Sequence, residues 1–392
     1  MTSVPAHKSD SVFARMVELR RTFHRHPELA FEEERTAATI MAELDRLGIP
    51  YEYTGRGGCV VGRLAGGVAQ APIVALRADM DALPGEEATS LPFVSEAPGK
   101  MHACGHDAHM AMVLGAAALL KDDPPPGNVL FVFQPAEERG GGARVVLKTG
   151  LLKGARAIFG GHVTHHYRTG EIMVTEGVIT AQSDRFLIRI QGRGGHGARP
   201  HEAIDAVVIT GLLITAIQTL VSREVNPVYP TVVTIGKVQA GTAANVIADA
   251  ATLEGTIRTT LPSVREHIHN GLRRMARALG ELHSASLEVT ITEGYPPVLN
   301  SARETTIARH AALQVVGKDG VVAQDYPSLG AEDFAYYLQE LPGCYVRFGA
   351  RLRDREYIPL HSPAFDIDEE VLRVGAAYFD RVVREALAEY RR

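Results

Sequence analysis

The residues best suited to chemistry lie in the segment MHACGHDAHM, residues 101–110. It places Cys104 close to His106 and His109 in a chain that has 3 cysteines. A cysteine among histidines can be a nucleophile with a neighbouring base, a redox thiol or a metal ligand. Three widely spaced cysteines without a CxxC pair argue against a disulfide framework and against a paired redox site. The nucleophile and the metal ligand remain as alternatives.

Two pairs of acidic residues follow apolar runs. PIVALRADMDALP runs into Asp79 and Asp81, and NVLFVFQPAEE runs into Glu137 and Glu138. Two carboxylates at the end of a strand point in different directions, so one can bind a metal while the other transfers a proton. Each pair alone is more typical of a solvated turn with helix-capping acids.

Two histidines complete a possible ligand set. ARAIFGGHVTHH provides His162 after an apolar run, and IPLHSPAFD provides His361. A single histidine in such a place is more often a surface residue than a ligand. Together with Cys104, His106 and Glu138, however, they supply the sulfur, nitrogen and oxygen donors that a borderline metal such as zinc prefers. The set therefore favours a metal site over a thiol nucleophile.

Helical and apolar segments alternate in the first part of the chain. The predicted helices are 11–24, 33–47 and 109–121, and the predicted strands are 59–64, 72–78, 128–134 and 155–160. This alternation predicts an α/β sheet, and open α/β sheets bind ligands at the carboxyl ends of their strands. Cys59 and Cys344 lie in apolar runs and are expected to be buried.

The pattern changes at about residue 184. The segments are strand 186–191, helix 202–222, strands 231–238 and 251–259, helix 263–279 and strand 286–293. The order β-α-β-β-α-β is that of a ferredoxin-like α+β domain. Because candidate ligands lie on both sides of 184–295, we expect one catalytic domain, with a central sheet and flanking helices, assembled from 1–183 and 296–392. Residues 184–295 would then form an inserted lid.

Composition excludes several classes of protein. The 392 residues carry a formal net charge of -5, and 45% are hydrophobic and 22% charged, which is typical of globular proteins. Basic residues are scattered singly, so nucleic acid is not an expected partner. The sequence lacks an apolar N-terminal segment and any run of eighteen apolar residues, so we expect a cytoplasmic protein without a membrane span.

A glycine-rich motif invites a second interpretation. GRGGHG, residues 192–197, matches the dinucleotide-binding pattern GxGxxG. However, Arg199 and Pro200 separate its last glycine from the next helix, and the following strand TVVTIGKV ends without the acid that would bind a ribose. We therefore reject a nucleotide cofactor.

The motifs taken together resemble a known family over nearly the whole chain. They are FHRHPELAFEE, RADMDALP, HACGHDAHMA, QPAEE, GHV, GGHGARPH, NVI, EDFAYY and LHSPAFD, in that order. The sequence is similar to the aminoacylase and carboxypeptidase-like zinc peptidases, and within them to the hippurate hydrolase or N-acyl-amino-acid amidohydrolase subgroup. This resemblance implies two divalent metal ions, for which zinc, manganese, cobalt and nickel all suit the mixed donors. The implied ligands are Cys104, His106, Glu138, His162 and His361, and the implied general base is Glu137.

The resemblance also implies roles for residues around this set. Asp79 and Asp81 would help to orient the ligand residues without binding the metal themselves. His196 would reach the active site of a partner subunit to stabilise the oxyanion. Asn245 and Arg258 would bind the carboxylate of the substrate, although Arg258 is nearly as well explained as a solvated residue on a strand. The implied assembly is a homodimer, or a higher homo-oligomer, that pairs through the lid.

The predicted function is metal-dependent hydrolysis of the amide bond in N-acyl amino acids such as hippurate or N-acetyl amino acids. A dipeptidase or carboxypeptidase of the same family is the alternative, and a metal-binding regulatory protein without catalysis is a third. Two departures from the family concern the pocket: THHYRTGE follows GHV where a proline-containing loop is common, and Ala248 replaces a proline. The first leaves the preferred acyl group and amino acid open.

Overall fold

The computed structural model describes residues 6–67, 71–352 and 355–391, which divide into two compact units. The first unit comprises Met1–Gly177, Leu299–Asp325 and Asp333–Arg392, and the second comprises Val178–Val298 and Tyr326–Glu332. The second unit thus begins before residue 184 and ends after residue 295, the boundaries expected from the sequence. It also includes the segment Tyr326–Glu332, because Ser328 exchanges backbone hydrogen bonds with Ile179 and Ala181.

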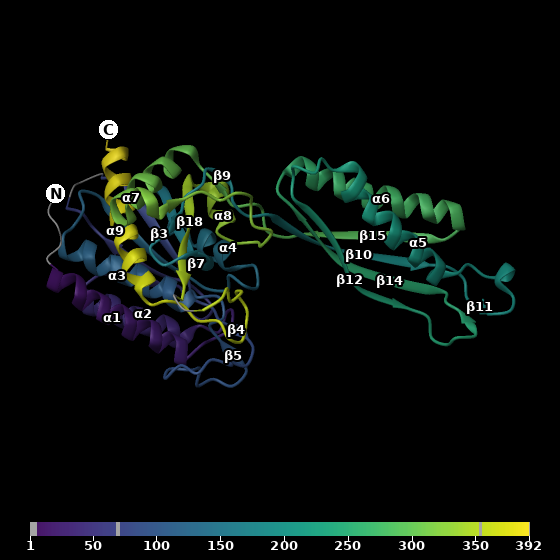
Figure 1. Cartoon of the computed structure of the whole chain (residues 1–392), viewed down its shortest axis with the longest axis horizontal. Helices are drawn as coiled ribbons and strands as arrows, with labels where there is room; N and C mark the ends of the chain where they lie inside the picture. The colour runs from purple at the N-terminus through teal and green to yellow at the C-terminus, as the bar shows by residue number, and fades with distance from the viewer. Residues whose placement is uncertain (1–5, 68–70, 353–354, 392) are drawn as a thin grey trace. The chain divides into compact units, whose positions relative to one another are not determined.

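An eight-stranded mixed sheet forms the centre of the first unit, and Figure 1 labels its strands β3, β7 and β18. The strand order is β1-β2-β6-β3-β7-β18-β8-β17. Its strands are β1 (Tyr51–Tyr53), β2 (Val60–Leu64), β3 (Ile73–Asp79), β6 (Asn128–Gln134), β7 (Ala155–Arg168), β8 (Ile172–Met173), β17 (Val321–Val322) and β18 (Gly343–Arg351). The four strands β6, β3, β7 and β18 are parallel to their neighbours within this group. They are buried along nearly their whole length, which explains their continuous apolar sequences. The predicted central mixed sheet with flanking helices is confirmed.

Helices cover this sheet. They are α1 (Ala6–Arg25), α2 (Glu34–Leu47), α3 (His106–Asp122), α4 (Gly142–Thr149), α7 (Ala302–Gly320), α8 (Ala335–Glu340) and α9 (Glu370–Tyr390). Helix α3 packs against α1, α9 and the central strands, and it is buried on nearly all sides (Figure 1). Its sequence is accordingly apolar around the whole circumference. Cys59 and Cys344 are buried, as expected.

The second unit contains a four-stranded antiparallel sheet with strand order β12-β14-β10-β15. In chain order its elements are β10 (Gln182–Gln191), β11 (Gly195–His196), η1 (Pro200–Glu202), α5 (Ala206–Thr219), the π-helical turn Leu220–Glu224, β12 (Thr231–Ala240), β13 (Val246–Ile247), β14 (Ala250–Thr259), α6 (Pro262–His283) and β15 (Ser286–Glu293). Both long helices contribute to one apolar core with the sheet. The order of the main elements is β-α-β-β-α-β. The remaining short strands of the chain are β4 (Leu83–Pro84), β5 (Lys100–Met101), β9 (Gly177–Val178) and β16 (Leu299–Asn300).

Helix α5 is unusually apolar. Among the residues that the structure describes, Ala206–Glu224 is the stretch whose length and composition would suffice to cross a membrane, and 33% of its most apolar window is buried. Core helices meet the same criteria, and Ile209 and Leu213 of α5 are buried in the core of the second unit. Its opposite side leaves apolar side chains exposed, namely Val207, Val208 and Leu212.

Strand β7 differs from its prediction. The apolar run predicted a strand over 155–160 followed by a loop, but β7 continues to Arg168. Strand β18 pairs with it in parallel register from Gly343 opposite Ile158 to Gly349 opposite Thr164, and after a register shift Arg351 pairs with Arg168. His162 therefore lies within a strand, and so does most of the segment THHYRTGE that was compared with a loop of the family.

Candidate metal centre

Gly105 sets the geometry of the loop that carries Cys104 and His106. It adopts a φ of +85°, and an added Cβ would lie 2.3 Å from Cγ2 of Val163. Glycine is therefore the residue that fits both the left-handed backbone and the close approach of β7. Cys104 lies before this glycine, and His106 is the first residue of α3. Both side chains are buried as a result.

His106 is oriented by the backbone of Asp81. Its Nδ1 lies 2.8 Å from the carbonyl oxygen of Asp81 and must donate its proton there, which leaves Nε2 with a lone pair. Nε2 forms no hydrogen bond with the described residues although the side chain is 1% exposed. Its closest recorded ion-pair partner, Oδ2 of Asp79, lies 3.8 Å away, beyond hydrogen-bond distance. A buried nitrogen without a hydrogen bond is costly unless another group satisfies it, and a metal ion would do so.

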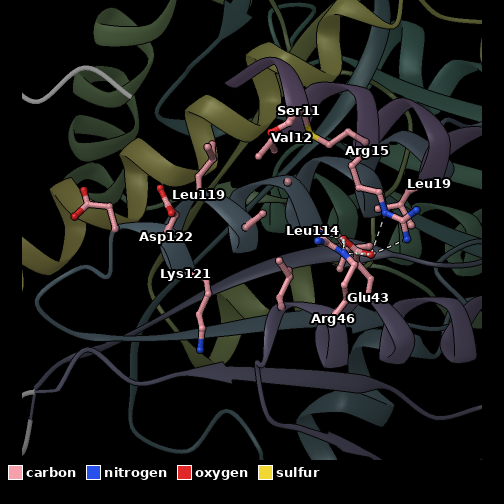
Figure 2. Close-up of a pocket in the computed structure, with 15 residues that line it drawn as sticks. Ser11, Val12, Arg15, Leu19, Glu43, Arg46, Leu114, Leu119, Lys121 and Asp122 are labelled. Atoms are coloured by element: carbon pink, nitrogen blue, oxygen red, sulfur yellow. Dashed lines mark hydrogen bonds and ion pairs between the residues drawn. The ribbon is translucent and has the colours of Figure 1, made fainter. Parts of the chain in front are cut away.

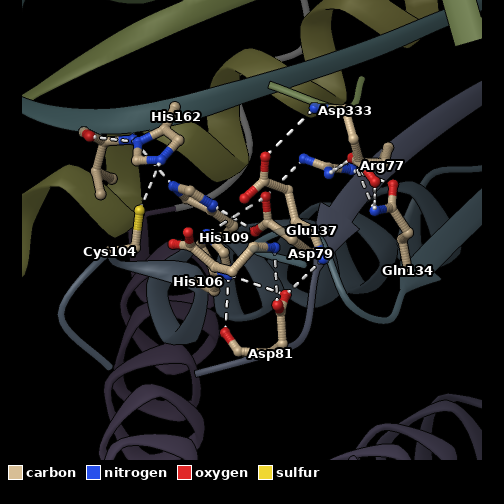
Figure 3. Close-up of polar contacts among 12 residues, drawn as sticks. Arg77, Asp79, Asp81, Cys104, His106, His109, Gln134, Glu137, His162 and Asp333 are labelled. Atoms are coloured by element: carbon tan, nitrogen blue, oxygen red, sulfur yellow. Dashed lines mark hydrogen bonds and ion pairs between the residues drawn. The ribbon is translucent and has the colours of Figure 1, made fainter. Parts of the chain in front are cut away.

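His162 is oriented in the same way. Its Nδ1 lies 2.6 Å from the carbonyl oxygen of Val163, and its Nε2 lies 3.3 Å from Sγ of Cys104 (Figure 3). Ligand atoms of Cys104, His106 and His162 all lie within 4.8 Å of one another, and so do those of Cys104, Glu138 and His361. Cys104 belongs to both groups.

We call these five residues, Cys104, His106, Glu138, His162 and His361, the donor cluster. Burial, together with the carboxylates of Glu138 and Glu137, raises the pKa of the Cys104 thiol well above its usual value. A thiol in this environment is protonated at neutral pH and is a poor nucleophile. The same negative field favours a cation. The cluster therefore fits a divalent metal better than it fits cysteine catalysis.

The turn that follows β6 carries Glu137 and Glu138. One carboxylate oxygen of Asp81 accepts a hydrogen bond from the backbone N–H of Glu137, and the other accepts one from Glu138, each at 3.0 Å. Ala136, just before them, has a φ of +51°, and its N–H donates to Oε1 of Glu33 at 2.8 Å. A left-handed non-glycine residue costs free energy, so the two buried carboxylates hold a strained turn in place.

Glu137 is buried and held by a residue that the sequence did not single out. Its Oε1 accepts a hydrogen bond of 3.3 Å from the backbone N–H of Asp333 (Figure 3). The Asp333 carboxylate accepts in turn from Arg77, Gln134 and the N–H of Ala143. Asp333 belongs to the motif EDFAYY, which contributed to the family resemblance, but nothing in the sequence indicated that it meets Glu137.

His361 differs from the other donors. It lies in a turn, and its φ of +66° is another left-handed non-glycine conformation. Its N–H donates to the carbonyl oxygen of Ala103 at 2.8 Å, which ties the turn to the loop of Cys104. Nε2 of His361 lies 3.2 Å from Oε1 of Glu138, and its side chain is 54% exposed.

Other nearby histidines are already engaged. His109 was expected in the helix as a pocket or packing residue, and its Nδ1 lies 2.7 Å from Asp79 while its Nε2 accepts from the N–H of Val163. Although His109 and Asp79 lie close enough to His106 to form a third possible ligand group, both ring nitrogens of His109 are thus occupied. Both nitrogens of His165 also contact backbone groups, at 2.7 and 3.2 Å.

The remaining predicted residues lie in the second unit. His196 is exposed on β11, and the neighbouring Gly197 donates a backbone hydrogen bond of 2.9 Å to Asn245. Arg258 lies near the other end of β14, which starts at Ala250. At about 3.3 Å per residue, Arg258 is roughly 26 Å along the strand from Ala250. The structure thus brings His196 and Asn245 together but does not bring Asn245 and Arg258 together within one chain.

A pocket of about 680 Å³ opens between α1, α2 and α3, but it contains none of the predicted site residues (Figure 2). Met16, Leu19 and Leu114 contribute its apolar lining. The charged side chains at its rim neutralise one another, because the buried Glu43 accepts from both Arg15 and Arg46. Nothing in its chemistry calls for a charged ligand.

Comparison with known proteins places this site in a family. Residues 75–385 match the model of "Peptidase family M20/M25/M40". The chain is 40% identical to N-acetylcysteine deacetylase of Bacillus subtilis, over 95% of this chain and 97% of the relative. It is 38% identical to thermostable carboxypeptidase 1 of Saccharolobus solfataricus, over 92% of each.

A solved structure agrees over the whole length. The Bacillus subtilis YXEP protein, described as a dinuclear metal-binding peptidase, superposes with a TM-score of 0.85 at 36% identity, covering 97% of this chain and 99% of that one. The resemblance read from the motifs is therefore confirmed. This chain belongs to peptidase family M20/M25/M40.

Proposed function

We propose that the protein is a metal-dependent amidohydrolase that cleaves N-acyl amino acids to a carboxylic acid and a free amino acid. One observation carries this proposal: ligand atoms of Glu137, His106 and Glu138 lie within 4.8 Å of one another, yet Glu137 is oriented separately by Asp333. A carboxylate beside a ligand set, but not needed in it, is what a general base requires. The name of the deacetylase relative supports an N-acyl substrate.

The donor cluster would hold two divalent ions, and Cys104 is the donor common to its two groups of ligand atoms. When bound, such ions lower the pKa of water towards about 7 and polarise the carbonyl of the amide. Two observations support this assignment: Nε2 of His106 lacks a hydrogen bond among the described residues, and the donors combine sulfur, nitrogen and oxygen. Zinc, manganese, cobalt and nickel all suit these donors.

Glu137 would take a proton from the attacking water and deliver it to the leaving amine. Its burial keeps bulk water away, and the N–H of Asp333 fixes the position of its carboxylate. Asp79 and Asp81 orient the residues around the cluster. Asp81 contacts His106 and accepts a hydrogen bond from the backbone N–H of Glu137, and Asp79 contacts His109.

We further propose a homodimer in which the second unit acts as a lid. His196 and Asn245 of one subunit would reach the active site of its partner, where His196 would donate a hydrogen bond to the oxyanion. Asn245 would bind the substrate carboxylate there together with Arg258 from the subunit that holds this active site. The separation of Asn245 and Arg258 within one chain supports this division. The exposed apolar side chains of α5 are suited to a subunit interface. A cytoplasmic location agrees with the three free cysteines.

Replacing the base with its amide tests the mechanism. Glu137→Gln should keep metal content and thermal stability while turnover falls by about 10²- to 10⁴-fold, the usual contribution of general acid–base catalysis. Glu138→Gln is the contrasting variant, because it should lose metal. Assays with N-acetyl amino acids, hippurate and simple dipeptides would separate the amidohydrolase from a dipeptidase. Normal hydrolysis by Glu137→Gln would contradict the assigned role.

Subunit complementation tests the shared site. His196→Ala and Glu137→Ala should each be inactive, and mixed dimers formed after subunit exchange should recover part of the activity, because one of their two sites is intact. Exchange is measured independently with tagged subunits. Exchange without recovered activity would contradict a trans-acting His196.

A further inference from the structure

Arg347 lies on β18 next to the donor cluster. In the parallel register of β18 and β7, Arg347 is directly opposite His162. Register partners on neighbouring strands project their side chains to the same face of a sheet. Arg347 therefore shares the face from which His162 reaches Cys104. Tyr345 precedes it by two residues on this face and packs against Phe334, with ring centroids 4.7 Å apart.

The guanidinium of Arg347 has no counter-ion among the described residues. The side chain is half-buried, and it forms neither a hydrogen bond nor an ion pair there. Its charge contributes to lowering the pKa of both His162 and His166, after burial as the main cause. A half-buried charge that lacks a counter-ion is costly, so the site favours an anion.

The groups next to Arg347 do not neutralise its charge. Arg351, further along β18, adds positive charge, and its own guanidinium is occupied by the carbonyl oxygens of His165 and His166, at 2.6 and 2.8 Å. His166 is exposed and stacks on Tyr357, with ring centroids 4.9 Å apart. Arg347 thus lies near both His162 of the donor cluster and the exposed His166, because its charge helps to lower the pKa of each.

We propose that Arg347 determines specificity by binding a second carboxylate of the substrate, in addition to the α-carboxylate. The preferred substrates would then be N-acyl amino acids with an anionic acyl group or an acidic side chain. Arginine suits this task because its planar fork binds a carboxylate through two parallel hydrogen bonds. The inference rests on the proposed amidohydrolase function, in which the α-carboxylate is assigned to Asn245 and Arg258.

Two matched pairs of substrates test the inference. N-succinyl-alanine and N-butanoyl-alanine differ by a carboxylate on the acyl group, and N-acetylglutamate and N-acetylglutamine differ by one on the side chain. The wild-type enzyme should favour the charged member of one pair by about 10- to 100-fold in kcat/KM, as expected for hydrogen bonds to charged groups. The pair that shows the preference identifies which arm of the substrate meets Arg347.

Variants assign the preference to the residue. Arg347→Met should abolish it while leaving kcat/KM for the neutral member nearly unchanged, and Arg347→Lys should keep part of it. Arg63→Met, a change on β2 of the same sheet, is the matched control and should keep all of it. A wild-type enzyme without preference in either pair, or a preference that survives in Arg347→Met, would overturn the inference.

Binding separates this inference from the proposed function. Calorimetric titration of Glu137→Gln with each charged substrate and its neutral partner should show tighter binding of the charged member of one pair, which is lost when Arg347→Met is added. Equal affinities within both pairs would overturn the role of Arg347. Absence of hydrolysis for all four compounds by the wild-type enzyme would instead contradict the amidohydrolase proposal, and the binding experiment would still decide the role of Arg347.

Discussion

Asp81→Asn should damage the candidate metal centre without touching any proposed ligand. The Asp81 carboxylate is buried and accepts two backbone hydrogen bonds, from Glu137 and Glu138, each at 3.0 Å. Asparagine keeps one acceptor oxygen, but its amide nitrogen would face the other N–H donor. One hydrogen bond to a charged group is lost and a buried N–H remains unsatisfied, which together cost about 2–4 kcal/mol of unfolding free energy.

The same change should weaken metal binding, because the backbone of Glu138 is then free to shift. Residues that orient ligands typically contribute about 10- to 100-fold to metal affinity. Affinity is measured by competition with a chelating dye, unfolding by urea titration of the metal-free protein, and kcat/KM at saturating metal. Asp45→Asn, an exposed change, is the control. Metal affinity and kcat/KM within twofold of wild type would refute the view that Asp81 positions this turn.

Two further predictions concern the residues around the cluster. Gly105→Ala introduces a Cβ 2.3 Å from Val163 at a φ of +85°, and should cost about 2–4 kcal/mol in urea unfolding; Gly150→Ala, at a φ of +73° with nothing within 4 Å, should cost only about 1 kcal/mol. Equal losses would contradict the role of close packing. Burial raises the pKa of Glu33 from 4.5 to about 7, although backbone hydrogen bonds oppose the shift. A group whose pKa is higher in the folded than in the unfolded protein stabilises the fold at a pH below its unfolded pKa, and this contribution is lost as the pH rises through its folded pKa. The melting temperature of wild type should therefore fall relative to that of Glu33→Gln between pH 4.5 and 7. If the melting temperatures of wild type and Glu33→Gln changed equally with pH across this range, Glu33 would not titrate in the folded protein.

Much of the fold could be read from local patterns. The predicted helix 33–47 is α2, Glu34–Leu47, and Gly48 ends it in a left-handed conformation as expected. Helix 263–279 is the middle of α6, Pro262–His283. These agree because hydrophobic periodicity and helix-ending residues act over a few positions. Strand β7 was predicted too short because its last residues are polar, and its pairing with β18 involves a distant part of the chain.

Some features of the site could likewise be predicted from the sequence, and others depend on the tertiary structure. The types of the donor residues favoured a metal over a thiol nucleophile, since few chemistries require cysteine, histidine and glutamate together. The order of the motifs over nearly the whole chain indicated the family. Which atoms face the cluster was decided by tertiary structure. The tautomers of His106 and His162 follow from carbonyl oxygens that approach through the fold, and His109 is removed as a ligand by contacts with Asp79 and β7.

The hold of Asp333 on Glu137 and the position of Arg347 opposite His162 also depend on contacts between distant parts of the chain. Such contacts depend on sheet register and on strained turns, which composition and spacing do not encode. The sequence alone thus determined which chemistry this protein carries. The tertiary structure decided which atom of each residue is available for it, because hydrogen-bond partners far apart in the chain occupy the others.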